Sequence, residues 1–330
     1  MIFGHERQIA YLRKVLQVSR TGHAYLFSGP DMVGKRTIAM EWVRLFFCKA
    51  PDVAAFQSCG TCVPCLAITS QSHPDVIMVS PSRPLVGDPK KEIGIDTVRE
   101  IKRLASFTPH EGGRRLFLID EAEFLREESQ NSLLKLLEEP ALGTVFILIT
   151  DTPGALLPTI LSRVVPISFT PLSDTRMRMV AEQLLNGRHA SAKRAIAQDV
   201  WKEAEDLSRM AAGRPGFIVR AVTDASFFET EKKAQKLVAE LLEEGIVACL
   251  LRGEALAKDR DAFRHFSDRF LTCSRRALLQ GPGPRVSRAL KAALDIRFAA
   301  LHTNASTRLA ADALFLHWHL RDANAARLPS

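Results

Sequence analysis

Residues 114–163 read RRLFLIDEAEFLREESQNSLLKLLEEPALGTVFILITDTPGALLPTILSR, and this stretch decides the fold of the chain. Apolar runs rich in strand-forming residues predict two buried strands, at residues 116–119 and 145–150. Between them, leucines at helical spacing predict a helix that ends before Pro140, because a proline ring cannot continue a helix. Strand, helix and strand in this order are typical of the parallel crossover unit of an α/β fold.

Polar side chains stand where both predicted strands end. Asp120 and Glu121 follow the first strand directly, and the second strand ends on the hydroxyl of Thr150. Ligands of open α/β sheets bind beyond the carboxyl ends of the strands. Two adjacent acids at that edge therefore predict a metal site with a water-activating base.

A glycine loop near the N-terminus has the layout of a phosphate-binding site. A strand at residues 25–28 leads into a loop with Gly29, Gly34 and Lys35, and an apolar helix follows at residues 37–47. In such loops, backbone N–H groups and the lysine hold phosphates. The sequence therefore predicts a nucleotide-binding loop, with a tight glycine turn that holds no ligand as the alternative.

The loop departs from the motif directly after its lysine. Arg36 stands where a serine or threonine normally holds Mg²⁺. Thr37 comes one residue late, about 100° further round the helix, and is a poor substitute. The loop thus predicts impaired hydrolysis and leaves open whether ATP with Mg²⁺ occupies it.

Four of the six cysteines lie close together in the sequence, at Cys48, Cys59, Cys62 and Cys65. Four thiolates at this spacing predict a closed tetrahedral Zn²⁺ site, which is structural because it leaves no coordination position for a substrate. Reduced free thiols and a disulfide cluster are the alternatives, and a cytosolic location argues against disulfides.

Composition and length limit the class of protein. At 330 residues, with 46% hydrophobic and 25% charged residues, the chain is expected to form two or three globular domains. No apolar run reaches the roughly 18 residues that a membrane helix needs, so we expect a cytoplasmic protein without a membrane partner. The net charge of +8 is compatible with a polyanionic partner, but basic residues on solvated helix faces explain it without one.

The rest of the chain adds two strands and many helices. Strands are predicted at residues 76–79 and 164–169, and a helix at residues 96–106 is expected to have Asp96 as its N-cap. Arg99, Lys102 and Arg103 give this helix one basic face. From Pro171 onward the pattern is helical, with predicted helices at residues 174–185, 191–200 and 201–210, a break at residues 213–216, and helices through the remainder.

Together these pieces resemble the clamp-loader branch of the AAA+ ATPases, the clamp-loader subunits of bacterial DNA polymerase III. Specific motifs carry the resemblance over roughly the first half of the chain. The helical remainder resembles the family only in its architecture. The motifs are HAYLFSGPDMVGK (23–35), the four-cysteine insert, HPD (73–75), LIDEAE (118–123), NSLLKLLEEP (131–140) and LSR (161–163).

The resemblance implies a three-part α/β architecture. A RecA-like AAA+ parallel-sheet domain is expected at residues 1–170, with the zinc insert at residues 48–65. A small helical lid is expected at residues 171–222, and an all-α collar domain for oligomerisation at residues 223–330.

The same resemblance assigns roles to single residues. Asp120 and Glu121 occupy the Walker B positions, and Thr150 occupies the sensor 1 position. Ser162 and Arg163 fit a Ser-Arg-Cys motif in which Val164 replaces the cysteine. In the family, that arginine reaches the γ-phosphate held by a neighbouring subunit. An ion pair at the end of a helix is the alternative explanation for this arginine.

Departures from the hydrolytic subunits point to a subunit that hydrolyses ATP poorly or not at all. Arg36 replaces the Mg²⁺-binding hydroxyl, and in Gly213-Arg214-Pro215-Gly216 a glycine fills the position of the sensor 2 arginine. The resemblance then implies a component of the DNA polymerase III holoenzyme that works in a hetero-oligomeric ring with tau/gamma-type and delta-type subunits. Such a ring opens the sliding clamp and places it on primed DNA.

Two alternatives stay open at this point. One is an autonomous Mg²⁺-dependent ATPase of the tau/gamma type, which would use Lys35, Asp120 and Glu121, with Thr37 holding the metal. The other is a zinc-dependent nucleic-acid binder outside any clamp loader. The sequence leaves open whether the chain alone is an enzyme.

Overall fold

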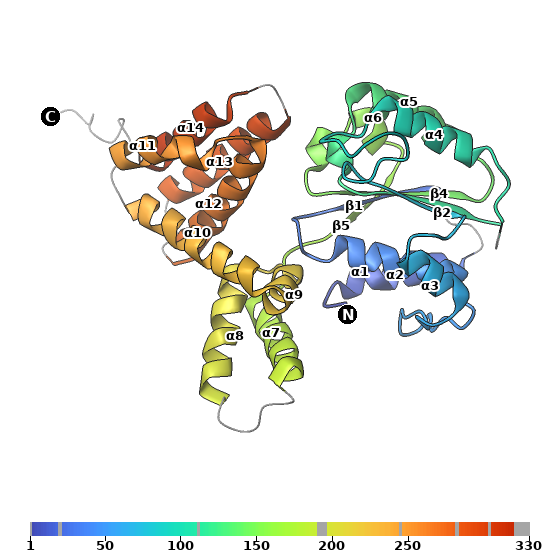
Figure 1. Ribbon diagram of the computed structural model, residues 1–330, viewed down its shortest axis with the longest axis horizontal. Coiled ribbons are helices and arrows are strands. Elements are labelled where there is room, and N and C mark those ends of the chain that lie inside the picture. The colour runs from blue at the N-terminus through green and yellow to red at the C-terminus, as the bar shows by residue number, and fades with distance from the viewer. Residues whose placement is uncertain are drawn as a thin grey trace. The chain divides into compact units, whose positions relative to one another are not determined.

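The computed structural model (Figure 1) describes residues 2–18, 22–110, 113–189, 197–243, 246–280, 284–302 and 305–319. The first part of the chain is built on a five-stranded sheet with the strand order β2-β3-β4-β1-β5 and parallel pairing throughout. The strands are β1 (Ala24–Ser28), β2 (Val76–Val79), β3 (Arg115–Ile119), β4 (Thr144–Thr150) and β5 (Val165–Ser168). The predicted parallel-sheet α/β fold is confirmed.

Helices cover both faces of the sheet, as Figure 1 shows. One face carries α1 (Glu6–Gln17), α2 (Lys35–Phe47) and α3 (Val63–Thr69), and the other carries α4 (Ile95–Ala105), α5 (Glu127–Glu138) and α6 (Pro158–Leu161). Successive strand residues point to opposite faces. Tyr25 and Phe27 accordingly pack in one core with Trp42, whereas Leu26 packs in the other core with Leu133. Strands β1, β3 and β4 are buried over their whole length, as expected for a sheet covered on both sides.

The N-cap predicted for α4 is wrong. Gly94 precedes the helix, and Asp96 lies in its first turn, where its carboxylate pairs with Arg99 at 2.9 Å. Arg103 pairs with Glu100 at 2.7 Å. Two of the three residues of the predicted basic face are therefore neutralised by acids of the same helix, which favours a solvated surface over a phosphate contact.

Three helices follow the sheet along the chain: α7 (Asp174–His189), α8 (Ala197–Ala211) and α9 (Pro215–Thr223). The predicted break between residues 200 and 201 is wrong, because α8 runs through it without a glycine or proline to interrupt it. Residues 191–196 of the predicted helix lie outside the described residues. Pro215 and Gly216 lie in the first turn of α9, where proline loses no intrahelical hydrogen bond.

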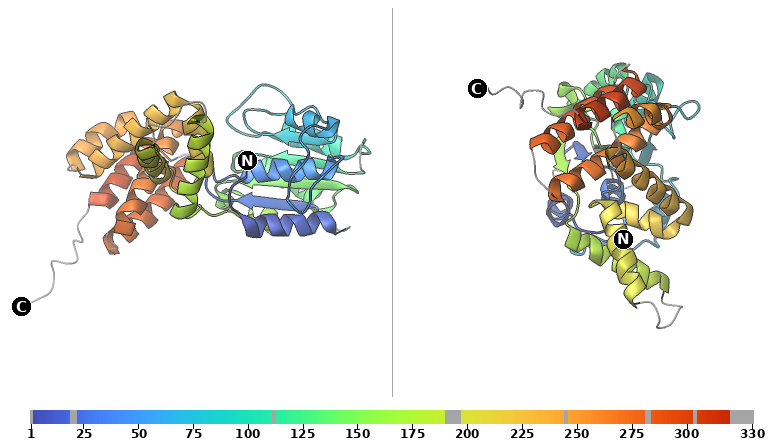
Figure 2. Two further views of the ribbon diagram at one scale, coloured as in Figure 1. Left: turned by 90° about the horizontal axis from the view of Figure 1, so that it is seen from below. Right: turned by 90° about the vertical axis from the view of Figure 1, so that its left-hand side faces the viewer.

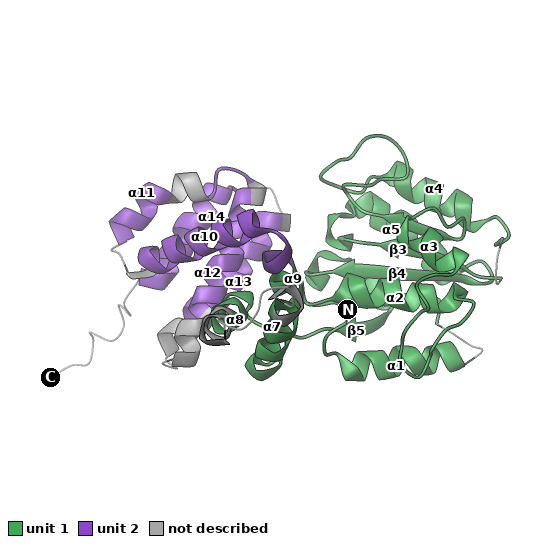
Figure 3. Cartoon of the chain, turned by 60° about the horizontal axis from the view of Figure 1, so that its bottom comes forward, with its two compact units in different colours: residues 1–219 green, residues 220–330 purple. Residues whose placement is uncertain are grey.

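The chain divides into two compact units, residues 1–219 and 220–330 (Figure 3). The second unit is helical over its described residues, which pack as a bundle (Figure 1 and Figure 2). Phe263, Phe266, Phe270 and Phe315 form its centre, with Phe266 and Phe315 at 5.4 Å between ring centroids. Its helices are α10 (Ala225–Glu243), α11 (Ile246–Leu256), α12 (Arg260–Gln280), α13 (Pro284–His302) and α14 (Thr307–His319).

The all-α character predicted for the C-terminal part is confirmed. The three-domain division with boundaries after residues 170 and 222 stays a prediction. Among the described residues, none of the helices has both the length and the apolar character needed to cross a membrane.

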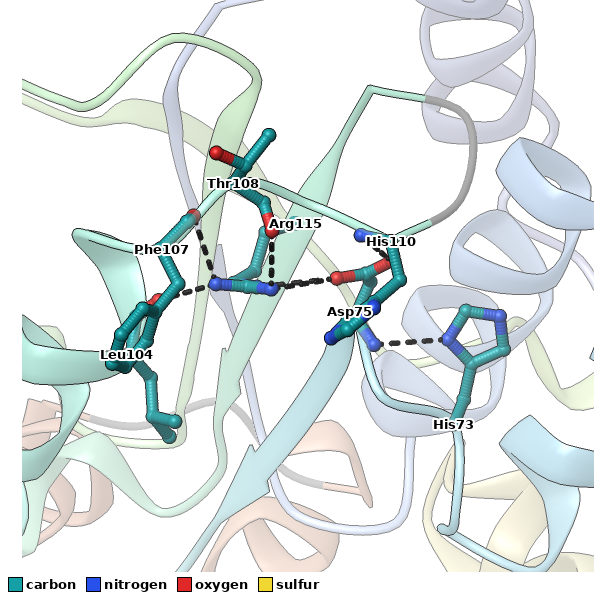
Figure 4. A network of polar contacts seen from close by, with 7 residues as sticks. All are labelled: His73, Asp75, Leu104, Phe107, Thr108, His110 and Arg115. Carbon is teal, nitrogen blue, oxygen red and sulfur yellow. Dashed lines mark hydrogen bonds and ion pairs between the residues drawn. The ribbon is translucent and has the colours of Figure 1, made fainter.

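A buried ion pair joins the amino ends of β2 and β3 (Figure 4). Asp75 directly precedes β2 and Arg115 begins β3, and their side chains meet at 2.8 Å with almost no solvent exposure. Arg115 also donates to the carbonyl oxygens of Leu104, Phe107 and Thr108. The second carboxylate oxygen of Asp75 accepts from the backbone N–H of His110 at 2.8 Å. The acid of the HPD motif therefore fixes the segment between α4 and β3 to the sheet.

We expect Asp75→Asn to destabilise the first unit strongly. The substitution keeps the shape of the side chain but leaves the buried guanidinium of Arg115 without its counter-charge, which costs about 3–5 kcal/mol. Urea unfolding of the full chain measures the loss. Asp88→Asn, at an exposed acid, is the matched control and should change stability by less than about 0.5 kcal/mol. Equal stability of the two variants would show that the pair contributes nothing beyond a surface charge.

Candidate functional site

The predicted site residues of the sheet meet at one edge, beyond the carboxyl ends of β1, β3 and β4. The N–H of Gly29 donates to the carbonyl oxygen of Thr150 at 3.3 Å, which joins the glycine loop to the end of β4. The N–H of Asp120 donates to the carbonyl oxygen of Val79 at 2.8 Å. The side chain of Thr150 is buried, and its hydroxyl oxygen accepts from the N–H of Thr152 at 3.0 Å.

Two glycines allow the loop to take its shape. At Gly29 a Cβ atom would lie 2.2 Å from the carbonyl oxygen of Phe169, and φ is +148°, so any side chain there is excluded. Gly34 has φ of +108° and caps the first turn of α2, a conformation that side chains rarely adopt. The predicted sequence of strand, glycine loop and helix is present, and it lies tightly against the end of β5.

Lys35 is folded back onto its own loop. Its ammonium group donates to the carbonyl oxygens of Gly29 at 2.6 Å and Pro30 at 2.8 Å. Burial lowers the pKa of Lys35, while the carboxylates of Asp151 and Asp31 oppose this change. The lysine thus closes the loop internally, and a phosphate would have to exchange with these carbonyl contacts.

The two predicted acids have different surroundings. Arg36 lies with its Nη1 atom 3.1 Å from Oδ2 of Asp120, whose side chain is only 14% exposed. Burial raises the pKa of Asp120, and the guanidinium of Arg36 opposes this shift. Glu121 is exposed and has a left-handed backbone with φ of 53°. Thr37, the substitute for the missing hydroxyl, is exposed.

These residues do not fit a bound Mg²⁺ ion. The position that should offer a hydroxyl ligand carries a cation instead, and this cation already contacts the acid that should bind the metal. The prediction of a metal site with a water-activating base at Asp120 and Glu121 therefore has no support from the geometry.

Two further acids lie at this edge, Glu123 and Asp151, and neither was among the predicted site residues. Glu123 is buried on the short 3₁₀ helix at Ala122–Phe124, and burial together with the neighbouring carboxyl of Asp151 raises the pKa of Glu123 to about 8. The signal was present as the third acid of LIDEAE and as the aspartate directly after Thr150. These carboxyls and that of Asp31 surround the ammonium group of Lys35.

The position of the sensor 2 arginine has no room for a side chain. The N–H of Gly216 donates to the carbonyl oxygen of Met32 at 2.8 Å, and a Cβ atom on Gly216 would lie 2.8 Å from the same oxygen. Arg214 instead donates from Nε to the carbonyl oxygen of Ala211 at 3.0 Å and lies over the ring of Phe217. The start of α9 is therefore seated on the glycine loop through backbone contacts.

Arg163 follows the end of α6, and its contacts are with Glu138, Thr159 and Ser162 rather than with the acids near Lys35. Its guanidinium pairs with Glu138 at the end of α5 at 2.6 Å, with the arginine 36% and the glutamate 46% exposed. It also donates to the carbonyl oxygen of Thr159 at 3.0 Å and to the hydroxyl of Ser162 at 3.1 Å. The ion pair considered as an alternative is present. Exposed pairs contribute at most about 1 kcal/mol, so exchange of Glu138 for another anion costs little.

The four predicted cysteines come together on and before α3. Their sulfur atoms all lie within 4.8 Å of one another. Zinc–sulfur bonds of about 2.3 Å in a tetrahedron require sulfur atoms roughly 3.8 Å apart, so a small contraction suffices. The N–H groups of Cys59 and Cys62 donate to the sulfur atoms of Cys48 at 3.3 Å and Cys59 at 3.4 Å.

The donor set has the chemistry of a zinc site. Backbone N–H groups of Thr61 and Cys62 lower the pKa of the Cys59 thiol to about 6, which favours the metal-binding thiolate. Burial raises the pKa of the Cys65 thiol to about 12, and a bound divalent cation would reverse that preference. The cluster could therefore hold Zn²⁺ through four sulfur ligands.

Sequence comparisons place the relatives of this chain among the subunits of DNA polymerase III. The family model described as DNA polymerase III, delta subunit, matches residues 4–173. The delta-prime subunit of DNA polymerase III from Pseudomonas aeruginosa is 39% identical over 143 residues, which cover 43% of this chain and 42% of that protein. The delta-prime subunit from Bacillus subtilis is 31% identical over 234 residues, covering 70% of this chain and 63% of that protein.

The tau subunit from Escherichia coli is 31% identical over 208 residues, covering 63% of this chain and 31% of that protein. Each of these alignments spans less than two thirds of the relative's length. A solved DNA polymerase III gamma subunit-related protein from Thermotoga maritima covers 94% of this chain and 98% of its own, at 18% identity and a TM-score of 0.46, which is too low to carry an argument.

The matched segment contains the glycine loop, the four cysteines, the acids after β3 and Arg163, whereas Arg214 and Gly216 lie beyond it. Because the family model matches just over half of its length, this chain belongs to the DNA polymerase III delta-subunit family, among the relatives of the delta-prime subunits.

Proposed function

We propose that this chain is a delta-prime-like subunit of the replicative clamp loader, acting in the bacterial cytoplasm. It joins a hetero-oligomeric ring with tau/gamma-type and delta-type subunits, and the ring loads the sliding clamp onto primed DNA. Family membership and the relatives named delta-prime and tau support this role. The chain contributes to ATP turnover through its neighbour rather than through its own nucleotide loop.

One contrast carries the proposal: the chain's own loop is closed, whereas its arginine is accessible. In the loop, Arg36 contacts Asp120, and Gly216 lies against the backbone of Met32. Arg163 is partly exposed and held by a surface ion pair. A subunit with these features is poorly equipped to hydrolyse ATP and well equipped to act on a nucleotide bound elsewhere.

The mechanism follows from the charge of the guanidinium. Phosphoryl transfer places negative charge on the γ-phosphate oxygens, and an arginine from a neighbouring subunit stabilises that charge. In the assembled ring, Arg163 exchanges its contact with Glu138 for the phosphate, which is the stronger anion and offers a bidentate, charge-assisted hydrogen bond. Ser162 and the carbonyl oxygen of Thr159 hold the arginine near the surface until that exchange.

Zinc has a structural role in this proposal. The cluster of Cys48, Cys59, Cys62 and Cys65 would bind Zn²⁺ with four sulfur atoms and leave no open position for a substrate. The metal would hold the segment before α3 against the first unit. It takes no part in ATP turnover.

A second candidate function is an autonomous Mg²⁺-dependent ATPase of the tau/gamma type. The strand, glycine loop and helix with Lys35 favour it, since this layout holds nucleotides in many proteins. It would require Thr37 and Asp120 to bind the metal, and in this structure Thr37 is exposed and Asp120 is paired with Arg36.

Replacing Arg163 is expected to impair ATP turnover by the reconstituted complex. Arg163→Ala removes the guanidinium, and loss of such an arginine lowers the rate at the affected site by about 10³-fold or more. ATP hydrolysis in the presence of clamp and primed DNA measures the effect, with gel filtration to establish that the ring still forms. Arg99→Ala, at another exposed and paired arginine, should leave turnover unchanged. Normal turnover with Arg163→Ala would refute the proposed role of this arginine.

The isolated chain is expected to hydrolyse ATP no faster than its own Glu121→Gln variant. Without a hydroxyl at residue 36 and a side chain at residue 216, the acid has no complete site around it. A steady-state ATPase assay of both purified proteins with Mg²⁺ makes the comparison. Robust turnover that disappears in Glu121→Gln would favour the autonomous ATPase instead.

Protein purified without chelator is expected to contain about one equivalent of zinc per chain, because four thiolates form one closed site. Cys62→Ser should lose most of the metal and lower the unfolding temperature, whereas Cys273→Ser, outside the cluster, should keep it. Elemental analysis and thermal unfolding give both readouts. Full zinc content in Cys62→Ser would contradict the assignment, and tight DNA binding that metal removal abolishes would favour the nucleic-acid binder.

A further inference from the structure

We propose that Arg36 is a tethered cation that occupies the place of the divalent metal at Asp120 and keeps Mg²⁺ out of the glycine-loop site. This inference rests on the proposed function, in which the subunit does not hydrolyse ATP itself. It adds the physical reason for that lack of hydrolysis.

The first step is the position of the two charged groups. Arg36 lies in the first turn of α2, directly after the lysine of the loop, and Asp120 follows β3. In phosphate-binding loops of this kind, a hydroxyl at the first position and an acid beyond the strand hold the metal between them. Here the same two positions are joined by an ion pair of 3.1 Å between Nη1 and Oδ2.

The second step is that the carboxylate of Asp120 requires charge compensation. Its side chain is largely buried, and a buried carboxylate is costly unless a cation or hydrogen-bond donors compensate it. The nearby ammonium group of Lys35 donates instead to the carbonyl oxygens of Gly29 and Pro30. Arg36 is the cation that contacts the carboxylate, and arginine keeps its charge throughout the physiological pH range.

The third step is the competition with metal. Mg²⁺ binds carboxylate oxygens at about 2.0–2.1 Å in a strict octahedral geometry. The guanidinium of Arg36 already contacts Oδ2 of Asp120, one of the oxygens that the metal would bind. Because Arg36 is part of the chain, its effective concentration at Asp120 is in the millimolar range or higher. A metal would have to displace the arginine and then remain beside its positive charge, which opposes binding strongly at such distances.

The charges of the neighbouring acids Asp31 and Asp151 act on the ammonium group of Lys35. Glu123 is buried, and burial together with the carboxyl of Asp151 raises its pKa to about 8, which disfavours the carboxylate form that a metal would need. Gly216 fixes the backbone of Met32 in the loop, which limits rearrangement of the site around a metal. Arg36, the raised pKa of Glu123 and the contact of Gly216 with Met32 therefore all disfavour a bound Mg²⁺ ion.

The test uses Mn²⁺ as a paramagnetic probe for the Mg²⁺ position, with zinc-loaded full-length protein and electron paramagnetic resonance. Binding is measured with Mn²⁺ alone and with Mn²⁺ and ADP. Wild type and Arg36→Lys, which retains a cation, are expected to show no Mn²⁺ site at Asp120. Arg36→Thr should bind Mn²⁺ more than about tenfold more tightly than wild type, since it removes the charge and offers the hydroxyl. Adding Asp120→Asn to Arg36→Thr should abolish the gain and so assign the site.

Two results would overturn the inference. One is a Mn²⁺ site in wild type that disappears in Asp120→Asn. The other is Arg36→Thr, folded as judged by circular dichroism, binding Mn²⁺ no better than wild type. Because the readout is metal binding by the isolated chain, failure here leaves the role of Arg163 in the complex untouched, and failure of the Arg163 experiment leaves this result standing.

Discussion

The parallel pairing of β1 between β4 and β5 is the constraint on which the rest of the first unit depends. It brings the carboxyl ends of the strands to one edge of the sheet, so that Gly29 follows β1 beside Thr150 and directly under the backbone of Phe169. The approach is so close that only glycine fits there. At the opposite ends of β2 and β3, the buried pair of Asp75 and Arg115 holds the connecting segment in place.

At that edge the charged side chains contact groups of the protein itself. Lys35 closes the loop on itself, and Arg36 compensates Asp120. Gly216 brings backbone onto the loop where an arginine side chain would otherwise reach toward phosphate. The two substitutions relative to the hydrolytic pattern, Arg36 and Gly216, thus each have a structural counterpart. The guanidinium of Arg163, just after the short helix α6 on the opposite face of the sheet, is partly exposed and paired with Glu138.

The α/β architecture of the first unit rests on its own packing. The buried strands and their two cores require the fold whether or not a nucleotide binds. The cysteine cluster lies in the same unit, on and before α3, and its four sulfur atoms could hold a metal ion.

By itself the sequence determined the elements and their chemistry, since these depend on local patterns: apolar runs for the strands, the glycine loop, the spacing of Cys48, Cys59, Cys62 and Cys65, and the misplaced Arg36. Local patterns failed where a signal was weak, as in the uninterrupted α8 and the N-cap of α4. Only the tertiary structure decided that Arg36 meets Asp120, that Arg163 rests on Glu138, and that Glu123 is buried beside Asp151. Such contacts join residues far apart in the chain, and they follow from strand order and close packing, which no local pattern encodes.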